Sequence, residues 1–184
     1  MKFPRLIPTV LLACLLALKA EESQGNQEGP QQLTIVEYFA QLPPRTFEGT
    51  PAEMLRFIRQ AGNIIDTKNG YIRCEGDGAQ GTFEVALFRY RDRRPLIVVS
   101  TGSTEGEKGT YLQLFEGGAD GKMRRLDNSV FPIADVGQAE NGGPSEKWHF
   151  DLPRHGKTIL VRSTRSGKVA HRITWTGEKF QEAK

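Results

Sequence analysis

From Asn69 to the end of the chain, apolar and polar residues alternate in short runs that are separated by tight turns. Alternation with a period of two is typical of β-strands that are buried on one face. The run 96–100 is apolar almost throughout, so we expect a central strand that is covered on both faces. The runs that we interpret as strands are 71–75, 82–90, 96–100, 111–115, 122–126, 146–152, 158–163, 169–174 and 179–181.

Two segments before this region carry helix signals. Thr34 and Glu37 have the spacing of a capping box, which predicts a short helix over 35–41. The β-branched pair at the start of that segment also fits a strand. A second helix begins with the cap and proline of Thr50-Pro51 and ends before Gly62.

These elements predict an α+β fold, with one or two N-terminal helices on a mainly antiparallel, meandering β-sheet that forms a sandwich or an open barrel. A segment of about 150 residues is large enough for one hydrophobic core, so we expect a single β-rich domain over 33–184. The expected core residues are Leu55, Ile58, Phe83, Val85, Leu87, Ile97, Val99, Leu112, Leu114, Trp148, Phe150, Ile159, Val161, Ile173 and Trp175.

The N-terminus has a composition of its own. Positive charges precede an apolar run over 6–18, and Ala20 is followed by polar residues. This pattern predicts a secretory signal peptide over 1–20, and its apolar run is short for a membrane span. Residues 21–32 contain no apolar side chain and should form a flexible tether. We therefore expect export, to the periplasm or to the medium.

The two cysteines bear on processing and on redox state. Residues 11–14 end in Cys14 and resemble a lipobox, which would make the protein a lipoprotein with a membrane anchor. The apolar run continues past Cys14, which favours cleavage after Ala20 instead. After that cleavage only Cys74 remains, so the mature chain cannot form an internal disulfide. Its alternation with Ile72 in a predicted strand favours a buried thiol.

The charge balance argues against nucleic acid as a partner. The chain has 25 basic and 22 acidic residues, and three of the basic ones lie in the first twenty residues, which hold no acid. The mature chain is therefore neutral and has no global field for a polyanion. Residues 145–184 nonetheless hold nine basic and four acidic residues. This excess fits either the solvated outer faces of strands or a contact with an anionic partner.

Aromatic and guanidinium groups are mixed at one predicted turn and in a second basic segment. Such a mixture can stack on sugars and bind anions, although a solvated turn has the same composition. We take it as the candidate surface for an envelope polymer or protein. Its residues are Arg89, Tyr90, Arg91, Arg93, Arg94, Arg154, His155 and Lys157.

No catalytic constellation is complete in the sequence, so we assign no catalytic residue, metal or cofactor. His149 and His171 would be the ligands of a metal site with Asp151, but the alternation directs His149 toward solvent and His171 toward the core. Glu84 alternates with apolar residues and is expected to point outward. A carboxylate pair that converges in space would still permit hydrolase chemistry.

Several motifs are similar to those of a family of small secreted or lipid-anchored bacterial proteins of no known activity. They lie at 69–71, 76–81, 86–89, 152–159 and 175–180, and the resemblance extends over about residues 33 to 181. It implies an origin in the bacterial envelope and supplies no site residue. We expect an exported binding or accessory protein without catalytic activity, with an envelope hydrolase as the alternative. The sequence does not define an oligomeric state.

Overall fold

The structure is a computed structural model, which describes residues 32–47, 49–60, 62–76, 81–102, 109–118, 120–137 and 147–183. The signal peptide predicted over 1–20, with Cys14, lies outside the described residues, as does the tether predicted over 21–32 apart from Gln32. Leu33–Lys184 form one compact unit, which contains every helix and strand described.

Two short helices begin this unit, and each starts with a capping box. They are α1 (Ile35–Ala40) and α2 (Pro51–Ile58). The Thr34 hydroxyl accepts the Glu37 N–H at 3.4 Å, and the Glu37 carboxylate accepts the Thr34 N–H at 2.6 Å. The same arrangement begins α2. Both predicted helices are confirmed, and the first segment is a helix rather than a strand.

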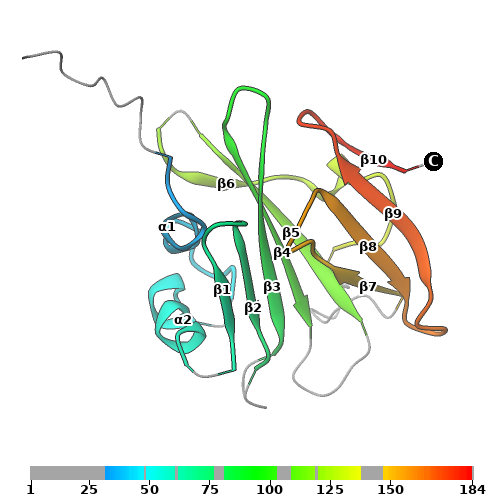
Figure 1. Ribbon diagram of the computed structural model, residues 1–184, viewed down its shortest axis with the longest axis horizontal. Helices are drawn as coiled ribbons and strands as arrows, with labels where there is room; N and C mark the ends of the chain where they lie inside the picture. The colour runs from blue at the N-terminus through cyan, green and yellow to red at the C-terminus, as the bar shows by residue number, and fades with distance from the viewer. Residues whose placement is uncertain are drawn as a thin grey trace, which may run out of the picture. The chain divides into compact units, whose positions relative to one another are not determined.

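The larger sheet has six antiparallel strands, each paired with its neighbour in the chain (Figure 1). The sequence predicts all of them except the first, whose residues Ile64, Ile65 and Asp66 do not alternate between apolar and polar. The strands are β1 (Ile64–Asp66), β2 (Tyr71–Cys74), β3 (Phe83–Arg89), β4 (Pro95–Gly102), β5 (Thr110–Gly117) and β6 (Met123–Arg125).

The smaller sheet has four antiparallel strands in the order β10-β9-β8-β7. A 3-10 turn, η1 (Asn128–Val130), lies in the connection from the larger sheet. All four strands are predicted from the sequence, with bounds within two residues. They are β7 (Trp148–Asp151), β8 (Thr158–Ser163), β9 (Val169–Trp175) and β10 (Phe180–Glu182).

The larger sheet is covered on both faces (Figure 1). One face packs against α1 and α2 and forms what we call the helix-side core. The other faces the smaller sheet and forms the inter-sheet core. On β4, Ile97 and Val99 enter the helix-side core while Leu96 and Val98 enter the inter-sheet core. The predicted central strand is confirmed, and so is the mainly antiparallel α+β fold, in which two sheets enclose the inter-sheet core without forming a closed barrel.

Most of the predicted core is buried, but three of its residues are only half-buried. These are Leu55, Leu87 and Trp148, which pack at the margins of the two cores. The separate prediction that the Cys74 thiol is buried is also confirmed. Trp148 lies on β7, the edge strand of the smaller sheet, where its indole N–H donates to the Ala134 carbonyl at 3.3 Å. Trp148 begins this edge strand, which has a neighbour on one side only, so its ring keeps contact with water although Phe150 on the same strand is buried.

Candidate functional site

The two groups of predicted binding residues lie at the same end of the sheets. One group occupies the turn between β3 and β4, and the other the connection between β7 and β8. The Arg91 N–H donates to the Gly177 carbonyl, in the β9–β10 turn, at 3.0 Å. The Trp175 N–H donates to the Lys157 carbonyl at 2.9 Å. The β9–β10 hairpin therefore joins both groups.

Most of the predicted arginines form ion pairs or hydrogen bonds within the protein and are not free to bind an anion. Arg89 donates to the Leu33 carbonyl at 3.3 Å, and its guanidinium lies 5.7 Å from the centre of the Tyr38 ring. Arg93, His155 and Lys157 are exposed. Ion pairs join Arg91 to Glu178 at 3.1 Å, Arg94 to Asp92 at 2.7 Å and Arg154 to Asp66 at 2.8 Å.

Arg154 fixes the β7–β8 connection to the end of β1. Its Nε lies 2.8 Å from the Asp66 carboxylate, which also accepts hydrogen bonds from Asn69. The hydrogen bonds from Asn69, followed by that from Arg154, hold the pKa of Asp66 well below its usual range. A carboxylate with so many donors is a structural anchor.

A cavity of about 440 Å³, which we call the end pocket, lies between the sheets at this same end. Segments far apart in the sequence contribute to it: β4, β5, the residue after β6, η1 and the β9–β10 hairpin. Four of its apolar lining residues are at most 5 % exposed and form the floor of the cavity, above the inter-sheet core. Leu126 and Val130 are the more accessible apolar residues of the lining. The apolar lining consists of Leu96, Leu114, Leu126, Val130, Trp175 and Phe180.

The aromatic part of this wall is held by specific contacts. The Trp175 indole N–H donates to the Arg89 carbonyl at 2.8 Å. Its ring meets the Tyr90 ring edge-on at 5.0 Å and the Phe180 ring at 4.8 Å between centroids. Such offset and edge contacts add to the stabilisation from burial. The wall is therefore preformed rather than assembled on binding.

Polar side chains lie at the mouth of the end pocket. The Tyr90 hydroxyl donates to Glu116 at 3.3 Å, and Arg94 lies 3.4 Å from the same carboxylate oxygen. Burial, followed by the Glu116 carboxylate, raises the pKa of Tyr90. Glu178 and Lys179 complete the polar lining. Of the predicted residues, Tyr90 lines the pocket directly.

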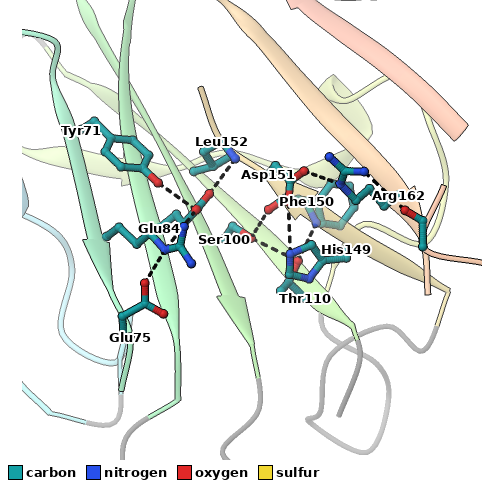
Figure 2. A network of polar contacts seen from close by, with 12 residues as sticks. Tyr71, Glu75, Glu84, Ser100, Thr110, His149, Phe150, Asp151, Leu152 and Arg162 are labelled. Atoms are coloured by element: carbon teal, nitrogen blue, oxygen red, sulfur yellow. Dashed lines mark hydrogen bonds and ion pairs between the residues drawn. The ribbon is translucent and has the colours of Figure 1, made fainter. Parts of the chain in front are cut away.

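A second, polar hollow of about 90 Å³ lies beside Glu84. Glu84 does not point outward as predicted, because the second face of β3 is covered by the smaller sheet. Its carboxylate accepts the Tyr71 hydroxyl at 2.8 Å and the Leu152 N–H at 2.7 Å (Figure 2). Burial raises the pKa of Glu84 above its ordinary 4.5, although the hydrogen bonds from Leu152 and Tyr71 oppose this shift.

Two buried hydroxyls beside this hollow join the larger sheet to β7 (Figure 2). Thr110 accepts the Phe150 N–H at 2.9 Å. The Ser100 hydroxyl lies 3.0 Å from the Phe150 carbonyl and 3.1 Å from the Thr110 hydroxyl. Both side chains are at most 5 % exposed. Because their hydrogen-bonding groups are used inside the protein, we interpret them as structural.

The histidines do not form a common site. His149 lies 3.2 Å from Asp151, which also accepts from Arg162, whereas His171 lies 2.8 Å from Glu182. Strand β8 separates their strands. Contrary to the prediction, His171 is at the margin of the core, with 28 % of its side chain exposed. Burial raises the pKa of Asp151, but hydrogen bonds from His149 and Arg162 outweigh it and lower that pKa overall. No group of three metal-binding side chains gathers among the described residues.

The sequence does not predict the end pocket, because its walls come together only in the tertiary structure. Val130 is the residue whose sequence context best indicates the pocket, because it is an apolar residue in an irregular polar segment. It is 45 % exposed, the one large apolar side chain of the described chain that is left exposed. A tight turn between the aromatic residues Trp175 and Phe180 is a second signal.

A scan against protein-family models, a search of curated proteins and a search of solved structures each return no match to this chain. The resemblance to small bacterial envelope proteins stays a prediction. Among the described residues, no helix has the length and apolar character needed to cross a membrane.

Proposed function

We propose that the protein is an exported, envelope-associated binding protein without catalytic activity, which holds the apolar part of a small ligand in the end pocket. One observation carries this proposal. A preformed cavity of about 440 Å³, walled by buried aromatic and aliphatic side chains, lies at the end of the sheets where the sequence predicts binding. Export rests on the N-terminal apolar run.

The dimensions and chemistry of the end pocket fit a small ligand better than an envelope polymer or protein. Ligand pockets commonly measure about 300–1,000 Å³ and combine apolar walls with a few polar groups. The candidate arginines, by contrast, are paired with carboxylates of the protein. The carboxylate partners of these arginines would compete with a long anionic polymer for the same guanidinium groups.

Binding of the dye N-phenyl-1-naphthylamine, which fluoresces in apolar surroundings, tests this proposal. We expect saturable binding to the exported chain. L126F places a larger side chain in the pocket wall and should weaken binding about tenfold. L55F is the matched control, because Leu55 is an equally half-buried leucine that packs against the helix-side core. Equal dye binding by both variants would contradict the proposal.

The hydrolase alternative draws on Glu84, a buried acid with a raised pKa beside a polar hollow that His149 also lines. Such a group is suited to general acid catalysis. However, its two oxygens already accept hydrogen bonds from Tyr71 and Leu152, which supports a structural role. Turnover of an ester, glycoside or peptide substrate that is lost in E84Q would favour the hydrolase.

A further inference from the structure

Lys179 lines the end pocket from a turn that the backbone holds in place. Its N–H donates to the Thr176 hydroxyl at 3.1 Å, and the Thr176 N–H donates to the Lys179 carbonyl at 3.0 Å. Between them Gly177 adopts a φ of +94° and accepts the Arg91 N–H. This turn fixes the base of the Lys179 side chain next to the wall residue Phe180.

The charged residues that line the end pocket differ in whether they have an ion-pair partner within the protein. Each acid of the lining already has an arginine within ion-pair distance. Glu178 lies 3.1 Å from Arg91, and Glu116 lies 3.4 Å from Arg94, which it shares with Asp92. No carboxylate among the described residues lies within ion-pair distance of the Lys179 ammonium. Within the described chain, Lys179 is therefore the one charged residue of the pocket lining that has no ion-pair partner of its own.

The aromatic wall does not form an open cage for a cation. The Arg94 guanidinium already covers the Tyr90 ring, 4.4 Å from its centroid. Trp175 packs against the Tyr90 and Phe180 rings. A cationic ligand would find neither a free aromatic face of Tyr90 nor an unpaired carboxylate, and it would meet the Lys179 charge.

The geometry points to an amphiphile as the ligand, with an alkyl chain and a single anionic head group. This inference rests on the proposed function. The alkyl chain lies along Leu126 and Val130, and the carboxylate of a fatty-acid-like ligand lies beside the Lys179 ammonium. Each methylene buried in the pocket should raise affinity about fourfold until the cavity is filled. The partly exposed ion pair should add about three- to fivefold.

Three amphiphiles with the same alkyl chain test the head group: dodecanoate, dodecanol and dodecyltrimethylammonium, each kept below its micelle concentration. In a W148F background the indole of Trp175, which lies in the pocket wall, is the sole tryptophan reporter. We expect dodecanoate to bind about three- to fivefold more tightly than dodecanol, and the ammonium compound to bind most weakly. K179Q should bring dodecanoate and dodecanol to the same affinity.

K168Q is the matched control, because Lys168 is an exposed lysine in the β8–β9 turn and its substitution changes the net charge equally. It should leave the preference for dodecanoate intact. If dodecanol binds as tightly as dodecanoate and K179Q changes nothing, the head-group inference is wrong while the proposed function stands. If none of the three gives a saturable change in Trp175 fluorescence, the proposed function fails with it.

Discussion

At the scale of single residues, Trp175 and Trp148 show how position within a sheet decides what a large aromatic side chain does. Trp175 is 3 % exposed, lies in the inter-sheet core and forms part of the pocket wall. Trp148 occupies the edge strand, where its indole contacts His171 and the Ala134 carbonyl. The sequence predicts both as core, because alternation does not distinguish an edge strand from an inner one.

The two tryptophans should therefore differ in their contribution to stability. W175A removes a buried ring from a packed cluster and should lower the free energy of unfolding by about 3–5 kcal/mol. W148A removes a half-buried ring and should cost about 1–2 kcal/mol. Urea unfolding followed by circular dichroism measures both. Equal losses would contradict the assignment of Trp148 to the margin of the core.

Glu84 shows a second limit of residue patterns. The alternation along β3 places Glu84 on the face opposite Phe83, and this assignment is confirmed. The pattern does not reveal that a second sheet covers that face. A charged residue between apolar ones fits an exposed strand as well as a buried, hydrogen-bonded carboxylate, so only the tertiary structure separates the two.

At the scale of elements, local signals predict most of the fold. Capping boxes start both helices, and tight turns separate the strands, because these features depend on residues close together in sequence. The β1–β2 turn depends on Gly70, whose φ is +67°. A Cβ atom at this position would lie 2.9 Å from Cβ of Leu87, closer than such atoms approach in proteins.

Alanine substitutions at Gly70 and Gly156 distinguish the cost of backbone strain from the cost of a steric clash. Both have positive φ, but a Cβ added at Gly156 meets no atom within 4 Å. G156A should cost about 1 kcal/mol through the unfavourable φ alone. G70A should cost about 2–3 kcal/mol, because the clash with Leu87 is added. Thermal unfolding of the two variants measures the difference, and a G70A loss no larger than that of G156A would argue against the close approach.

At the scale of the whole molecule, a few polar contacts join the two sheets across their apolar interface. Glu84, on β3, accepts the N–H of Leu152 at the end of β7, and Ser100 and Thr110 bond to Phe150. Because Glu84 is mostly buried, its ionisation is coupled to the packing of the sheets. This coupling predicts a dependence of stability on pH.

The sign of that dependence follows from the raised pKa. The folded protein binds a proton at Glu84 more tightly than the unfolded chain, so the stabilisation is complete below pH 4.5 and is lost as the pH rises through the raised pKa. In E84Q the amide oxygen can accept the Leu152 N–H while its NH₂ donates to the Tyr71 oxygen. We expect Tm to fall with rising pH in the wild type relative to E84Q.

Circular dichroism melts at a series of pH values measure this difference. A loss of 1 kcal/mol corresponds to about 2–4 °C for a chain of this size. Y71F removes one of the donors to the carboxylate, so it should make the fall steeper than in the wild type. If the difference in Tm between wild type and E84Q stays constant from pH 4 to pH 8, the assignment of a raised pKa to Glu84 is wrong.

The end pocket is the feature that sequence patterns could least predict. Periodicity places Leu114 and Trp175 on buried faces, which the structure confirms. Periodicity contains no information on the cavity between β5 and the β9–β10 hairpin, because that cavity depends on how the two sheets pack against each other. Tyr90 is a predicted binding residue because arginines surround it in the sequence. Its position at the pocket mouth results instead from packing against Trp175.

The connectivity of the sheets has a consequence for how the chain reaches this state. In both sheets every ladder joins strands that are consecutive in sequence. No strand must wait for a remote partner, so the entropy of closing long loops opposes pairing much less than in Greek-key sandwiches. We therefore expect each sheet to grow hairpin by hairpin, and burial of the inter-sheet core, with the Glu84 and Ser100 contacts, to follow as a late docking step.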